Sequence, residues 1–166
     1  FSAENHVWRA PHAYRREAMV CASTHDLPTL RGWWTCNDIN WRVKCARTTE
    51  TEAVIQRQDR QRDRKRLMDA LMGAQALKPD KDYAVAIEMH DVVIVAVHRF
   101  MAATPLRLLA VQLDDALGTV EQANVPGTVD EHPNWRRKIA VPIEELNDQP
   151  LLRAVANAVA TERPKR

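Results

Sequence analysis

The sequence predicts an α/β fold that is mostly helical and contains about two parallel strands, near residues 18–23 and 106–113. Two observations support this prediction. Each of the two segments is a short, continuous apolar run, which is typical of strands that are buried on both faces. Long stretches of helical character separate the two runs, and crossover connections of this kind join parallel strands.

Length and composition place the chain among folded proteins of one-domain size. It has 166 residues, of which 45 % are hydrophobic, and this is enough for a sizeable core. The 24 basic residues nearly balance the 22 acidic ones, so the net charge of +2 indicates no obligatory polyanionic partner. Cys21, Cys36 and Cys45 are odd in number and lack C-x-x-C spacing, which argues against a disulfide framework or a zinc ribbon and fits a reducing cytoplasm.

Neither a membrane span nor a secretory signal is recognisable in the sequence. No apolar run approaches the roughly 18 residues that a bilayer span requires, and no stretch has the order of a signal peptide. The chain begins at Phe1 with an irregular, polar segment that continues to residue 17. We therefore expect a cytoplasmic protein whose N-terminal part is missing here.

Residues 29–43 are expected to form a helix after the break at Pro28. The helix contains Trp33 and Trp34. Large aromatic side chains on a helix usually pack against a core, so packing is favoured for this pair over a stacking platform for a sugar ring.

The pattern of residues 49–78 predicts a helical insertion. Thr49 and Glu52 have the spacing of a capping box, so a long helix should begin here and continue to about Ala76. Its middle, residues 57–66, holds six basic and two acidic side chains. Because the basic residues lie all round the helix and no aromatic residue is interleaved, a solvated helix is favoured over a nucleic-acid interface.

A second helical stretch is expected from about Lys81 to Ala103, where Pro105 ends it. The second strand follows, and then residues 118–142, which show little periodicity and are too long for an ordinary connection. Such a long segment inside a compact region is usually functional.

The last element is expected to be a helix over about residues 150–162. Pro150 suits its first turn, and Asp148 or Asn147 is the expected N-cap. Apolar residues recur on one face of this segment, as they do in a helix that covers a core.

Two parallel strands alone leave two unpaired edges and two apolar faces, so the pair should belong to a larger sheet. One such sheet is a (β/α)8 TIM barrel, of which residues 1–166 would be a single incomplete region, the C-terminal part. In that fold the chemistry lies where strands end and loops begin. Both His25-Asp26 and the loop 118–142 follow a predicted strand.

His25 and Asp26 are the first candidate site residues. One interpretation is local, with Asp26 starting a turn whose Asp-Leu-Pro sequence caps the next helix. The other is functional, because an ionised Asp at a barrel mouth accepts hydrogen bonds from sugar hydroxyls or stabilises a cationic transition state. His25 would then be a neighbouring donor, and both side chains face one pocket only if the strand has ended before them.

No metal and no cofactor is expected. The six histidines show no paired spacing with cysteines or carboxylates, and the four scattered glycines make no phosphate-binding loop. Taken by its residues alone, the segment 120–138 is an ordered polar loop, in which Asn124, Pro126 and Gly127 indicate a tight turn.

Four segments together resemble the C-terminal part of one family, the bacterial 4-α-glucanotransferases or amylomaltases of glycoside hydrolase family 77. They are STHDLPTLRGWW, DRQRDRKRLMDAL, VHRFMAATPLRLLAVQLDDALG and EQANVPGTVDEHPNWRRK. The resemblance extends from about Met19 to the chain end. It implies a (β/α)8 barrel with inserted subdomains, and the transfer of 4-α-glucan segments between maltodextrins or starch-type glucans through a covalent glycosyl-enzyme.

By motif, the resemblance implies that Asp26 is the transition-state stabiliser, a third carboxylate that binds hydroxyls of the distorted sugar. His25 is implied as a sugar-binding donor in the same subsite, and Asn124 as a substrate contact. The nucleophile and the acid/base of the family come earlier in the chain, and neither motif is found in this sequence. Asp114 and Asp115 end a strand, but the family pattern assigns them no chemistry.

The resemblance therefore implies a C-terminal fragment of such an enzyme that is inactive by itself. Its strands would be completed by the remainder of the barrel or by a second copy of the chain, and neither nucleic acid nor a membrane is expected as a partner. Two alternatives stay open. One is a non-catalytic glucan-binding or assembly module derived from the barrel, and the other is a related hydrolase, since only the resemblance favours transfer over hydrolysis.

Overall fold

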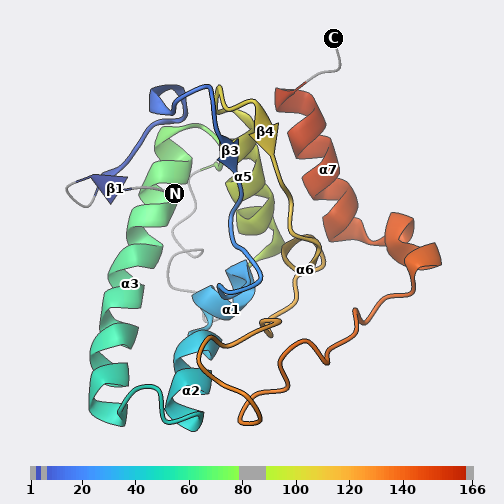
Figure 1. Ribbon diagram of the computed structural model, residues 1–166. Coiled ribbons are helices and arrows are strands. Elements are labelled where there is room, and N and C mark those ends of the chain that lie inside the picture. The colour runs from blue at the N-terminus through green and yellow to red at the C-terminus, as the bar shows by residue number, and fades with distance from the viewer. Residues whose placement is uncertain (1–2, 5–6, 79–88, 164–166) are drawn as a thin grey trace.

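The computed structural model describes residues 3–4, 7–78 and 89–163 of the chain. Three helices, α3 (Glu50–Gly73), α5 (Asp91–Ala102) and α7 (Pro150–Glu162), stand side by side with α5 in the middle (Figure 1). The short strands β3 and β4 lie along α5. Within the part of the chain that the structure describes, no helix is long and apolar enough to cross a membrane.

The two predicted parallel strands are present but short. β3 (Met19–Val20) pairs in parallel with β4 (Leu108–Leu109), with Met19 opposite Leu108. Leu113 was expected in the second strand and is instead the first residue of α6 (Leu113–Ala116), whose acidic first turn suits a helix N-terminus. The prediction of parallel strands is confirmed, and its boundary at Leu113 is wrong.

The N-terminal segment is more ordered than its composition predicts. β1 (Ala3–Glu4) and β2 (Val7–Trp8) pair antiparallel, and a 3-10 turn, η1 (Pro11–Ala13), follows them. Backbone pairing over so few residues needs no apolar periodicity, so the sequence pattern gave no signal of it.

The helix expected over residues 29–43 is two helices, α1 (Leu30–Trp34) and α2 (Asn37–Lys44). Cys36 separates them with a φ of 62°, in the left-handed region that breaks a helix. The apolar spacing runs across this break without a Gly or Pro to mark it, and the single-helix prediction was wrong for that reason.

The predicted capping box at the start of α3 is confirmed. The Thr49 hydroxyl accepts a hydrogen bond from the Glu52 N–H at 3.2 Å, and the Glu52 carboxylate accepts one from the Thr49 N–H at 2.9 Å. That second bond is the first cause of a lowered pKa at Glu52. The helix ends at Gly73, three residues before the expected Ala76.

The basic middle of α3 is not fully solvated, which corrects the sequence-based expectation. Arg60 forms a bidentate ion pair with Asp38 of α2, at 3.0 and 2.9 Å, and the two side chains are only 11 % and 12 % exposed. The guanidinium groups of Arg60 and Arg64 lie over the rings of Trp33 and Trp34, at 4.7 and 5.3 Å. Both arginines also donate to the carbonyls of these two tryptophans, which end α1. The basic side chains on this face fasten α3 to α1 and α2.

α5 begins later than the helical stretch expected from Lys81. Residues 79–88 lie outside the described residues, and His90 is the N-cap of a helix that starts at Asp91. The helix ends at Ala102, close to the expected end at Ala103.

The final helix agrees with the expected residues 150–162, and Pro150 occupies its first turn. Its N-cap is Gln149 and not Asp148 or Asn147, because a 3-10 helix, η2 (Ile143–Asp148), includes both of those residues. The capping prediction was therefore wrong by one residue.

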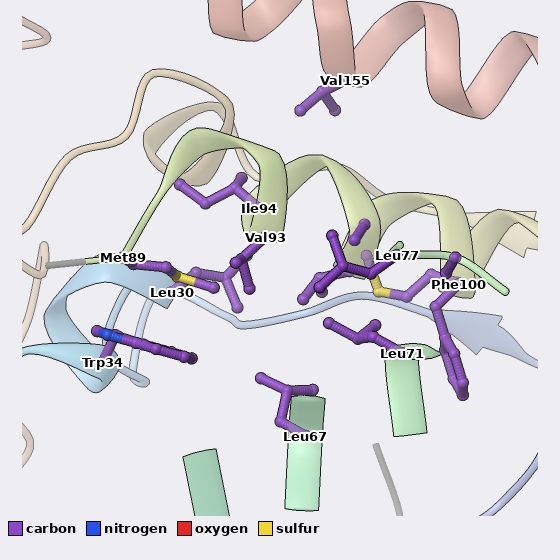
Figure 2. Close-up of a cluster of buried hydrophobic side chains, with 14 of the residues drawn as sticks. Leu30, Trp34, Leu67, Leu71, Leu77, Met89, Val93, Ile94, Phe100 and Val155 are labelled. Atoms are coloured by element: carbon purple, nitrogen blue, oxygen red, sulfur yellow. The ribbon is translucent and has the colours of Figure 1, made fainter. Parts of the chain in front are cut away.

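The core surrounds α5 on both sides (Figure 2). Val155 reaches α5 from α7, while Trp34 and Leu67 approach it from α1 and α3. Trp34 is fully buried, and Trp33 is partly buried against the same cluster, which confirms the packing interpretation of this pair. Leu30 of the core is also the first residue of α1, so the core fixes the segment that follows the first strand.

Candidate functional site

The candidate site lies where the turn after β3 meets the long loop between α6 and η2, which passes α1 and α2 in Figure 1. His25 and Asp26 lie in a turn that the Leu27 N–H closes by donating to the Thr24 carbonyl at 3.0 Å. The strand has therefore ended before both side chains. The cap of α1 is Thr29, which accepts from the Gly32 N–H at 3.0 Å. Asp26 therefore lies in a turn, as the local interpretation predicted, but it does not cap the helix.

The structure brings His25, Asp26 and Asn124 together. The Asn124 side-chain amide donates to Asp26 Oδ1 at 2.6 Å, and His25 Nε2 lies 3.2 Å from Asp26 Oδ2. Each carboxylate oxygen thus has one partner. The side chains of His25 and Asp26 remain 64 % and 51 % exposed, which leaves acceptor positions on the carboxylate open to a ligand.

Asp115 holds the turn from the interior. It is 1 % exposed, and its Oδ1 accepts from the Leu30 N–H at 2.6 Å, while its Oδ2 lies 2.7 Å from the Ser23 hydroxyl. Ser23 precedes the His25-Asp26 turn and Leu30 follows it. One buried carboxyl group therefore fixes both ends of the segment that carries Asp26.

The surroundings of Asp115 shift its pKa upward. The Ser23 hydroxyl also contacts the Gln112 side-chain oxygen, and a hydroxyl has a single proton to donate. Asp115 and Gln112 therefore share the Ser23 hydroxyl as a partner. Burial raises the pKa of Asp115 and outweighs the hydrogen bonds from Leu30 and Ser23 that lower it, because desolvation disfavours the charged form of a carboxyl group.

The long loop is ordered around Asn134. Its side-chain oxygen accepts from the Val125 N–H at 3.0 Å and from His132 Nδ1 at 2.7 Å, and its amide donates to the Thr128 carbonyl at 3.1 Å. Gly127 has a φ of 81°, and the Thr128 N–H donates to the Val125 carbonyl at 3.2 Å. Pro126 and Gly127 thus form the predicted tight turn, in which the glycine takes the position that needs a positive φ.

Glu121 and His132 attach this loop to α2. Trp41 Nε1 donates to the Glu121 carboxylate at 2.7 Å, and Arg137 donates to the same oxygen at 3.3 Å. The buried imidazole of His132 meets the ring of Trp41 edge to face, with centroids 4.5 Å apart. These contacts hold Asn124 in place opposite Asp26.

Trp135 is a site residue that the sequence analysis did not single out. Its indole lies 5.4 Å from the His25 ring, with an angle of 52° between the ring planes. It follows Asn134 directly in a segment without apolar periodicity. The available signal was a large aromatic side chain in a polar loop, where no helix or strand face calls for one.

The described residues place no group of three or more His, Cys, Asp or Glu side chains where they could hold a metal ion. Cys21, Cys36 and Cys45 are free thiols. The chemistry available at Asp26 is that of one carboxylate with an amide and an imidazole as partners. Such a group can bind hydroxyls or stabilise developing positive charge.

A family model described as 4-alpha-glucanotransferase matches residues 1–143. The 4-alpha-glucanotransferase of Haemophilus influenzae is 32 % identical over 132 residues, which is 78 % of this chain and 19 % of that protein. The 4-alpha-glucanotransferase of Mycobacterium tuberculosis is 34 % identical over 142 residues, 84 % of this chain and 18 % of its own length.

Among solved structures, the crystal structure of amylomaltase from Corynebacterium glutamicum superposes with a TM-score of 0.79 at 27 % identity. The match covers 92 % of this chain and 23 % of that one. The chain therefore spans about a fifth of the length of the proteins it matches, and it resembles them in sequence as well as in structure.

Proposed function

This chain belongs to the 4-alpha-glucanotransferase family, and on that premise we propose that it supplies the Asp26 subsite of an enzyme that transfers 4-α-glucan segments between maltodextrins. In this proposal Asp26 stabilises the transition state, and His25 and Asn124 bind the sugar. The whole enzyme works by retention, through a covalent glycosyl-enzyme. Its nucleophile and acid/base come from polypeptide outside this chain.

The observation that carries the proposal is the 2.6 Å hydrogen bond from Asn124 to Asp26. It joins two segments that are far apart in the sequence and orients a carboxylate that is still half-exposed. Glycoside cleavage passes through a transition state with oxocarbenium character, and a carboxylate fixed in advance stabilises that charge without reorganising. The exposed imidazole of His25 lies beside the same carboxylate, with Nε2 3.2 Å from Asp26 Oδ2.

We further propose that residues 1–166 are a single incomplete region, the C-terminal part of a (β/α)8 barrel. In this arrangement residues 49–78, which contain α3, are a helical insertion, and α7 is the final helix. The likeness to the C. glutamicum amylomaltase supports this. So do Met19 and Leu108, which face each other in the β3–β4 register and are both exposed apolar side chains. The remainder of the barrel, or a second copy of the chain, covers them.

We expect the isolated chain to bind maltotetraose weakly and not to turn it over. Asp26→Ala should weaken binding at least about tenfold, because a hydrogen bond to a charged group contributes on the order of 1.5–3 kcal/mol. Asp148→Ala, which removes an exposed carboxylate in η2, should leave binding unchanged. Titration followed by amide chemical shifts measures both variants.

The same preparation is incubated with maltotriose, and glucose and longer maltodextrins are followed. A retaining mechanism needs two carboxyl groups about 5 Å apart, and the recorded partners of Asp26 are an amide and an imidazole. Product formation above a mock preparation would contradict the proposed inactivity. Binding that survives Asp26→Ala would contradict the proposed subsite.

The exposed sheet face predicts self-association of the isolated chain. We expect sedimentation to show species heavier than one 19.0 kDa chain, because a second copy is then the only polypeptide able to cover Met19 and Leu108. Replacing both with Ser should shift the distribution toward monomer, whereas Ile143→Ser, at an exposed site in η2, should not. A purely monomeric wild-type chain that unfolds cooperatively would show that the strands need no cover.

A further inference from the structure

Trp135 is exposed, whereas Trp34 lies in the interior of the fold. Its side chain is 62 % exposed, while Trp34 is completely buried. Tryptophan is highly buried on average, so a largely exposed indole in an ordered loop is informative. Packing of the loop is therefore not what requires an aromatic residue here, because most of the surface of Trp135 is accessible.

The backbone of Trp135 is held in an unfavourable conformation. Its φ is 59°, which is uncommon for a bulky residue without a glycine's freedom. The Trp135 N–H donates to the Ala123 carbonyl at 3.1 Å, and the preceding Asn134 N–H donates to the His132 carbonyl at 2.7 Å. Strain that the surroundings maintain in this way is concentrated at binding and catalytic sites.

The same contacts place the indole beside the polar groups of the site. Ala123, which accepts from the Trp135 N–H, is the neighbour of Asn124, the residue that holds Asp26. The Trp135 and His25 rings are 5.4 Å apart, within the range of aromatic contacts. The apolar indole of Trp135 therefore lies next to the polar side chains of His25, Asp26 and Asn124.

We propose that Trp135 is a stacking platform for a glucosyl ring bound at Asp26. A pyranose has an apolar face of C–H groups and a rim of hydroxyls, which matches one aromatic face next to a carboxylate, an amide and an imidazole. The class of ligand is thus an α-glucan in its pyranose form. This inference rests on the proposed function, and it adds a binding residue from the long loop to it.

The test is a maltotetraose titration of the full chain, followed by the amide and indole N–H signals in NMR spectra. Trp135→Ala should raise the dissociation constant about fivefold, and Trp135→Phe should stay within about twofold of wild type, because a phenyl ring keeps an aromatic face. Ile143→Ala, another exposed apolar truncation, should have no effect. Sorbitol, which has hydroxyls but no ring face, should bind no more weakly to Trp135→Ala than to wild type.

The outcomes separate the two proposals. If Asp26→Ala abolishes binding and Trp135→Ala leaves it unchanged, the platform is refuted and the proposed subsite stands. If Trp135→Phe binds as weakly as Trp135→Ala, an aromatic face is not what the position supplies, and the platform is again refuted. Binding that is unaffected by Asp26→Ala, or absent in the wild-type chain, overturns the subsite and the platform together.

Discussion

Asp115→Ala should destabilise the chain by about 3 kcal/mol, whereas Asp115→Asn should leave stability close to that of wild type. Alanine leaves the buried Leu30 N–H without its partner and removes one of the two contacts of the Ser23 hydroxyl, and a buried unsatisfied group costs about 1–3 kcal/mol. Asparagine preserves both contacts, because its oxygen accepts from the Leu30 N–H and its amide donates to the Ser23 oxygen. Urea unfolding with an unchanged m-value measures the difference.

The pH dependence gives this prediction an internal control. Burial raises the pKa of Asp115 above its ordinary value, so the folded chain binds this proton more tightly than the unfolded chain does. Stability from this group is therefore largest at low pH and falls as the pH rises through the window between the unfolded and the folded pKa. Asp115→Asn should remove that decline. An identical pH profile in wild type and Asp115→Asn would contradict a raised pKa at Asp115.

The titration of His98 affects stability in the opposite direction. Its contribution must therefore be separated from that of Asp115 in the same pH profile. Burial lowers the pKa of His98. The hydrogen bond between its ring and the Ile94 carbonyl and the charge of Asp115 raise this pKa, but by less than burial lowers it. Its contribution to stability is present above its unfolded pKa and is lost as the pH falls toward the folded one. A comparison of Asp115→Asn with wild type cancels most of this effect, because both contain His98.

Arg60→Ala should destabilise the chain by about 3 kcal/mol, far more than Arg62→Ala on the same helix. Arg60 pairs with Asp38 where both side chains are nearly buried, and removing one partner of such a pair costs about 3–5 kcal/mol. Arg62 pairs with Asp59 in solvent, where ion pairs contribute about 0–1 kcal/mol. Thermal and urea unfolding of the two variants measure the contrast.

A double-mutant cycle identifies the cause of the Arg60 effect. Asp38→Ala combined with Arg60→Ala should be less destabilising than the sum of the two single changes, because the pair removes both buried charges at once. Arg60→Lys should recover only part of the loss, since an ammonium group cannot reproduce the bidentate geometry or the stacking over Trp33. Equal effects of Arg60→Ala and Arg62→Ala would show that α3 is not fastened at Arg60.

Local chemistry was sufficient to predict several elements from the sequence. The capping box of Thr49 and Glu52 is formed as expected, and the Pro126-Gly127 turn follows from residues whose φ preferences are known in advance. The parallel pairing of β3 and β4 followed from apolar runs joined by helical crossovers. In each case the information lies within a few residues or in the order of elements.

The sequence-based predictions failed where contacts between distant segments determine the structure. Cys36 breaks a helix without any residue that marks a break, and Arg60 leaves solvent only because α1 and α2 pack against α3. The positions of Asp115 and Trp135 were not predicted, since Asp115 contacts Ser23 and Leu30 and the Trp135 ring lies beside that of His25. The neighbours of a residue in the sequence do not indicate which distant residues it will contact.

The sequence by itself determined the order of the parallel strands and long helices, the capping box of α3, the Pro126-Gly127 turn, and a family resemblance that the comparisons confirm. It named His25, Asp26 and Asn124, whose roles in catalysis and binding stay predictions. Only the tertiary structure decided that the amide of Asn124 meets the carboxylate of Asp26, 98 positions away in the chain. Such a contact depends on how the loop is attached to α2 and how Asp115 holds the turn, and no local propensity specifies either of these.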